Sequence, residues 1–130
     1  MKAIFVFVSV MVLAACGPAE KQSVRQVVLY QHDGITVRVG PEPLLVEQVL
    51  QLDVQLPAGA SLKKAEIVGL SMAMGLIPLR IEARNRSYQS EFVLGACADP
   101  HMQWQLQLSL IDAAGMPLRL DVPFYTSWPK

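Results

Sequence analysis

The feature that most constrains the fold of this chain is a period-two alternation of apolar and polar residues, which recurs along most of its length. Successive side chains of a β-strand point to opposite faces, so this period is typical of strands that are buried on one face only. The alternation is cleanest at 104–110, where Trp and Leu alternate with Gln and Ser. Runs at 50–56, 88–94 and 118–124 predict further strands of the same kind.

Four other segments follow the same period less regularly. Residues 24–30 and 35–39 predict two short strands near the start of the domain, and 79–83 predicts another in the middle. Residues 63–74 predict a longer strand, but the face that it buries stays open. One of its faces carries Val68, Leu70, Met72 and Met74, and the other carries Ile67, Gly69, Ser71 and Ala73.

Gly and Pro residues separate these runs. Gly40-Pro41-Glu42-Pro43 predicts a break, and Pro57-Ala58-Gly59 and Asp112-Ala113-Ala114-Gly115 predict turns. Pro123, which cannot donate to a strand ladder, marks an edge or a bulge. No segment after residue 15 has a convincing helical period. About seven short strands with one-sided alternation therefore predict an all-β fold, an immunoglobulin-like antiparallel β-sandwich over residues 24–130.

The first fifteen residues predict a signal helix that is removed from the mature protein. Lys2 precedes an uncharged, mostly apolar run at 3–15, which is too short to span a bilayer. The run ends in Leu13-Ala14-Ala15-Cys16, which resembles the lipobox of bacterial lipoproteins. That resemblance implies cleavage before Cys16 and acyl chains, such as palmitate, on this cysteine. The mostly polar residues that follow, with Pro18 among them, predict a tether at 16–23. By resemblance to the lipoprotein sorting rule, Gly17 at the next position, where an Asp is absent, implies the outer membrane, facing the periplasm. The alternative is an ordinary signal peptide with an incidental Cys16.

Composition excludes several classes of function. The charges balance, with 11 Lys and Arg against 11 Asp and Glu, so no basic field exists for nucleic acid. The chain lacks a CxxC pair, a Gly-rich phosphate loop, an HExxH and a serine elbow. Cys97 and His101 imitate a thiol nucleophile and its base, but the only nominal third group is Asp99. We therefore expect a protein that is not an enzyme.

Soft metal ligands gather in two segments. The stretch from Gly95 to Trp104 holds Cys97, His101 and Met102, and Met72 and Met74 lie two residues apart earlier in the chain. Thiolate, thioether and imidazole groups are ligands that suit Cu(I). A lone thiol is unusual in an oxidising compartment, because Cys97 has no partner in its own chain once Cys16 is lipidated. We therefore predict a Cu(I) site with Cys97 and some of Met72, Met74, His101 and Met102.

Each of these residues also has an ordinary structural interpretation. Cys97 and the methionines can fill gaps in a core, and His101 can be a solvent-exposed residue near a strand start. The protein would then be an immunoglobulin-like interaction module of the cell envelope that binds no metal. Close approach of the 72–74 segment to the 97–102 segment favours the copper hypothesis, and separation favours the interaction module.

The order of short motifs between residues 40 and 125 resembles the small YtkA-like and FixH-like periplasmic domains. The motifs are Pro41-Glu42-Pro43-Leu44, Met72-Ala73-Met74-Gly75 with Pro78, Tyr88, Cys97 and a strand that begins at Trp104. The resemblance implies an immunoglobulin-like sandwich and copper handling, with an envelope partner in copper delivery or oxidase assembly. The commoner YtkA-like pattern has a histidine soon after the methionine pair, whereas here Leu76, Ile77 and Pro78 follow.

Overall fold

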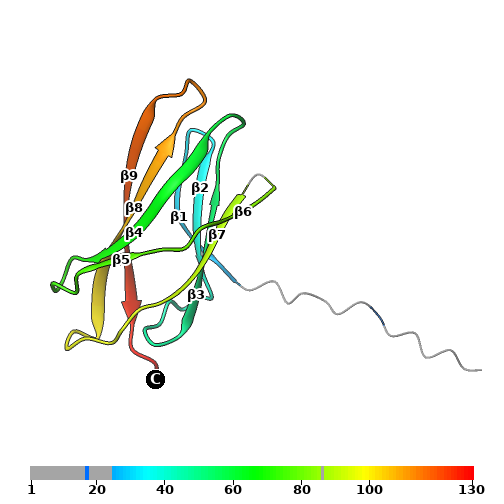
Figure 1. Ribbon diagram of the computed structural model, residues 1–130. Helices are drawn as coiled ribbons and strands as arrows, with labels where there is room; N and C mark the ends of the chain where they lie inside the picture. The colour runs from blue at the N-terminus through cyan, green and yellow to red at the C-terminus, as the bar shows by residue number, and fades with distance from the viewer. Residues whose placement is uncertain (1–16, 18–24, 86) are drawn as a thin grey trace, which may run out of the picture.

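The protein folds into two antiparallel β-sheets that pack face to face around one core (Figure 1). The computed structural model describes residues 17, 25–85 and 87–130. The first sheet has the order β1 (Val27–His32), β2 (Ile35–Gly40), β3 (Val49–Gln55), β7 (Ser87–Val93) and β6 (Glu82–Arg84). The second has the order β5 (Leu76–Pro78), β4 (Ser61–Gly69), β8 (His101–Ile111) and β9 (Pro117–Ser127).

The strand order confirms the predicted immunoglobulin-like sandwich. Strands β2-β3-β7-β6 facing β5-β4-β8-β9 reproduce the order ABED against C′CFG, with β1 added at the edge. After the break at 40–43 the chain crosses to the second sheet, where Leu45 forms a parallel bridge with Ser127. The Val46 N–H donates to the Ser127 carbonyl at 3.1 Å, and the Ser127 N–H donates to the Leu44 carbonyl at 3.0 Å.

The core is built mainly from the apolar side chains of the alternating runs. Leu50, Leu52 and Val54 of β3 face the interior, and Trp104, Leu106 and Leu108 of β8 face them from the other sheet; all six are buried. The indole Nε1–H of Trp104 donates to the hydroxyl of buried Thr126 at 2.8 Å, so the polar atom of this side chain is satisfied. The predicted register of 50–56, 88–94 and 104–110 is confirmed by this burial pattern.

Two predicted strands are wrong in their bounds. The run at 63–74 ends as a strand at Gly69, and a register shift between Leu62 and Lys64 turns Ala65 and Ile67 to the core. Met72 and Met74 therefore lie in a loop and share no strand face. The run at 79–83 is not one strand, because the chain leaves β5 of the second sheet at Pro78 and enters β6 of the first sheet at Glu82. This split explains why nine strands are found in the described residues, where about seven were predicted.

The two ends of the sandwich differ in construction. At the turn end, uppermost in Figure 1, the chain reverses at Asp33–Gly34, at 57–59, at Asn85 and at 112–115. At the loop end, lowermost in Figure 1, it runs through longer irregular segments at 41–48, 70–75 and 94–100. The peptide bonds before Pro41 and Pro43 in the first of these segments are cis.

The predicted signal helix and the lipidation site at Cys16 lie outside the described residues, as does the tether at 16–23 except for Gly17. Within the part of the chain that the structure describes, no helix has the length and apolarity needed to cross a membrane.

Candidate functional site

The loop that carries Met72 and Met74 is fixed against the start of β8. The backbone N–H groups of Leu70 and Ser71 donate to the Gln103 carbonyl at 2.8 and 3.3 Å. In return, the Gln103 N–H donates to the Ser71 hydroxyl at 2.8 Å. These three hydrogen bonds bring the loop beside Met102, the residue that precedes Gln103.

Gly69, the last residue of β4, allows the loop to fold this closely. A β-carbon at this position would lie 2.5 Å from the Met72 carbonyl oxygen and 2.8 Å from the Met102 Cε. The Met74 Cβ would lie 3.4 Å from the same point. The missing side chain of Gly69 therefore leaves a space around which Met74 and Met102 gather.

Met74 also reaches the segment that contains Cys97. Its Cε lies 3.9 Å from the position that a β-carbon would occupy on Gly95, two residues before the cysteine. The 72–74 segment and the 95–102 segment thus meet at the loop end, through Met74 on one side and Gly95 and Met102 on the other. Sequence alone left this meeting open.

The sulfur-containing residues at this end differ in their exposure to solvent. Met102 is 1% exposed and belongs to the core, whereas Met72 and Met74 are 39% and 38% exposed. Cys97 is half-buried and packs against the core cluster. It forms no disulfide with any residue that the structure describes. This end of the sandwich therefore carries one buried thioether, on Met102, and two partly exposed ones, on Met72 and Met74.

His101 lies on the other side of the sheet. The first residues of β8 alternate between exposed and buried, so exposed His101 and buried Met102 point to opposite faces. The backbone N–H of His101 donates to the Asp99 Oδ1 at 2.9 Å, and this bond closes the turn before β8. Asp99 was the nominal third group beside Cys97 and His101. In the structure its carboxylate accepts a hydrogen bond from the backbone instead.

Hard and borderline ligands do not gather in the described residues. No group of three His, Cys, Asp or Glu side chains in residues 25–85 and 87–130 is placed to hold a metal ion. A metal at the loop end would therefore depend on thioether sulfur, and this favours a soft ion over zinc or calcium.

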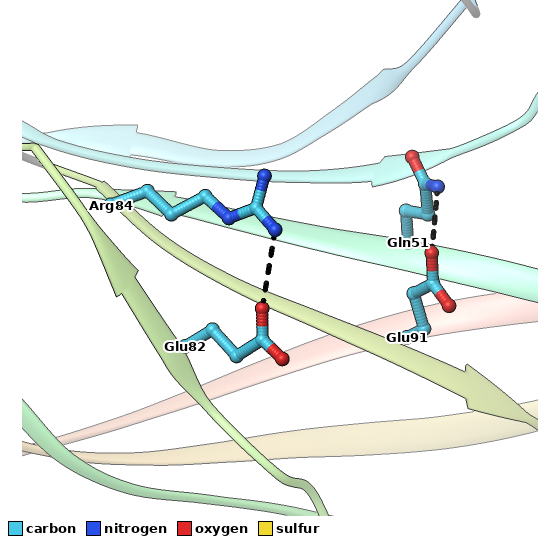
Figure 2. Close-up of polar contacts among 4 residues, drawn as sticks. All are labelled: Gln51, Glu82, Arg84 and Glu91. Atoms are coloured by element: carbon cyan, nitrogen blue, oxygen red, sulfur yellow. Dashed lines mark hydrogen bonds and ion pairs between the residues drawn. The ribbon is translucent and has the colours of Figure 1, made fainter.

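A polar groove, which the sequence did not predict, lies on the outer face of the first sheet. This groove of about 500 Å³ is lined mainly by polar side chains of β3, β7 and β6, with Arg80 before β6. Figure 2 shows two of its contacts: the Gln51 amide donates to the Glu91 carboxylate at 3.2 Å, and Arg84 pairs with Glu82 at 3.4 Å. Alternation correctly placed Gln51 and Glu91 outward, but the groove depends on β6, whose bounds were mispredicted. The members of these two pairs bind each other, whereas the Asp53 Oδ1 and the Ser90 Oγ are buried without a hydrogen-bond partner among the described residues. The residues that line the groove include no sulfur ligand.

Comparison with known proteins identifies no relative: no family model, no curated protein and no solved structure matches this chain. The resemblance to YtkA-like and FixH-like domains therefore depends on the short motifs alone.

Proposed function

We propose that this protein is a lipid-anchored envelope lipoprotein whose sandwich binds one Cu(I) ion at the loop end. The observation that carries the proposal is the position of Met74, between Met102 and the glycine two residues before Cys97. Thioether ligands from two distant segments and a half-buried thiol thus lie at one end of the domain. Cu(I) is the common biological ion that prefers such a ligand set.

Cys97 is the dominant ligand in this proposal, because only a thiolate brings negative charge to the ion. Met74 and Met72 complete the set from the loop, and Met102 supports them from the core. His101, on the opposite face from Met102, can join only from the outer side of the sheet. Metal binding releases the thiol proton, so affinity for Cu(I) falls as the pH is lowered.

The test is an anaerobic competition titration against a colorimetric Cu(I) chelator. We expect the wild type to take one equivalent of copper, Cys97→Ser to bind much more weakly and with little pH dependence, and Met72→Leu/Met74→Leu to bind at intermediate strength. Met116→Leu is the matched control, because Met116 is an exposed thioether at the turn end. A wild type that draws no copper from the chelator at micromolar protein, or a Cys97→Ser that competes equally well, rejects the copper site.

The second candidate is an interaction module of the cell envelope that binds no metal. It is favoured by exposed apolar side chains on the outer faces, such as the cross-strand pair Val49 and Val93. In that case the methionines of the loop end contribute to a contact surface. The variant Met72→Leu/Met74→Leu, which keeps the apolar character of both side chains, should then still bind the partner protein.

A further inference from the structure

Exposed apolar side chains are concentrated at the loop end. Six of them, each between 38% and 55% exposed, form what we call the apolar collar: Val49, Leu70, Met72, Met74, Val93 and Trp128. Single exposed apolar residues are normal on a protein surface, but a group of them at one end of a domain is typical of a surface that contacts a partner or a membrane.

Backbone pairing places the members of the collar at one end of the molecule. Val49 and Val93 form the last pair between β3 and β7. Leu70 begins the loop that is bonded to Gln103 near the start of β8. Trp128 follows Ser127, which pairs with the first residue of β8 and with the 44–46 segment. The collar therefore includes residues from the first sheet, from the loop between β4 and β5 and from the segment that follows β9.

The N-terminal segment enters the domain at the same end. The Arg25 carbonyl accepts a hydrogen bond from the Glu42 N–H at 2.8 Å, and the Arg25 side chain pairs with Glu42 at 3.3 Å. Residues 17–24 are all that separates Arg25 from Cys16. A fully extended chain spans at most about 3.6 Å per residue, so these eight residues reach about 29 Å at most.

We infer that the loop end docks on the surface of the membrane that holds the protein, with the apolar collar in contact with lipid. This inference rests on the lipid anchor at Cys16 in the proposed function, and it does not depend on copper. The short tether keeps the collar close to the bilayer, so even a weak apolar contact is populated. Trp128 is the type of side chain that prefers the interface between water and hydrocarbon. The entry point adds no net charge to this contact, because the Arg25 guanidinium and the Glu42 carboxylate pair.

The fluorescence of Trp128 can report contact between the collar and lipid. It has two tryptophans: Trp104 is fully buried and bonded to Thr126, whereas Trp128 is 45% exposed in the collar. The protein, extracted with its native N-terminus, is reconstituted in phosphatidylethanolamine–phosphatidylglycerol vesicles, with and without bromine on the acyl chains. Bromine quenches a tryptophan that touches the lipid. We expect quenching in the wild type and its loss in Trp128→Phe.

Two double variants test the surface itself. Val49→Asp/Val93→Asp places charge in the collar and should reduce the quenching of Trp128 while the protein still floats with the vesicles. Met116→Asp/Leu118→Asp changes two exposed apolar residues at the turn end and should leave quenching unchanged. Thermal unfolding of both variants verifies that each is folded.

The outcomes separate the anchor from the docking. Protein that floats with the vesicles but shows no quenching overturns the docking and leaves the anchor intact. Protein that does not float overturns both. A photo-reactive benzophenone side chain in place of Val93 should form adducts with lipid. Adducts with a second copy of the chain, or with another envelope protein, overturn the membrane contact in favour of a protein interface.

Discussion

At the turn end of the sandwich the chain reverses through short turns, whereas at the loop end it passes through three irregular segments before it re-enters a strand. The turn end is held by local bonds. The Asp112 Oδ1 accepts hydrogen bonds from the N–H groups of Ala114 and Met116 at 3.0 and 2.8 Å. Gly115 completes this turn at a φ of 81°, where residues with a side chain are strained.

The loop end is held by contacts between segments that are far apart in the sequence. Ser71 and Gln103 bond across the end of β4, and Glu47 donates to the Leu94 carbonyl at 2.8 Å. Turn chemistry can be recognised in a few residues, but such long-range contacts cannot. The turn end, which is held by local signals, is therefore predictable from the sequence, whereas the loop end, which carries the candidate site, is held by tertiary contacts.

The largest expected loss of stability comes from a substitution in the core, which supports both ends of the sandwich. Leu108 is fully buried in the middle of β8, between the two sheets. Leu108→Ala should lower the free energy of unfolding by about 2–5 kcal/mol, because it removes packed methyl groups and leaves a cavity. Chemical denaturation measures this loss, and exposed Ser109→Ala should change the stability little. Equal losses at both positions would contradict the assigned register.

A smaller effect should be confined to the loop end. Gly69→Ala places a β-carbon against the Met72 carbonyl and the Met102 methyl group, at 2.5 and 2.8 Å. The loop must shift, at a cost of about 1–3 kcal/mol. Hydrogen exchange should then rise at 70–74 and stay unchanged at the turn end. Gly95→Ala is the matched control, because its β-carbon would meet only the Met74 Cε at 3.9 Å. Similar exchange in both variants would show that the loop does not depend on the space at Gly69.

The smallest effect should be confined to the turn end. Asp112→Ala removes the acceptor of two backbone N–H groups in a solvent-exposed turn, at a cost of about 1 kcal/mol. Thermal unfolding measures the loss, and Asp112→Asn, which keeps an acceptor oxygen, should recover part of it. A shift in hydrogen exchange at 70–74 in Asp112→Ala would contradict the independence of the two ends.

Much of the fold could be predicted from the sequence, because strands buried on one face repeat their pattern every two residues. The prediction failed where the chain departs from a regular sheet. In β4 the register shift after Leu62 moves the core face to Ala65 and Ile67, and periodicity cannot detect such a shift. Between Pro78 and Glu82 the chain changes sheets, although its alternation continues.

The candidate site was predictable only in its residue types. The sulfur side chains of Met72, Met74, Cys97 and Met102 indicated soft-metal chemistry. The prediction that Met72 and Met74 share a strand face was wrong, because both lie in a loop. The two segments meet because Gly69 lacks a side chain and because Gln103 bonds to the loop. Both features are tertiary, and neither is visible in the local sequence.

The pairing of β8 with β9 has a consequence for the order of folding. These strands are the last in the chain, and they pair at eleven consecutive positions across one short turn. Such a hairpin forms in about 1–10 μs, whereas β3 must find β7 across a long intervening chain. The 44–46 segment likewise forms its backbone hydrogen bonds with Ser127, so these bonds also need the end of β9. A chain that is synthesised from its N-terminus would thus hold its first strands without a complete partner sheet until residues 101–127 emerge.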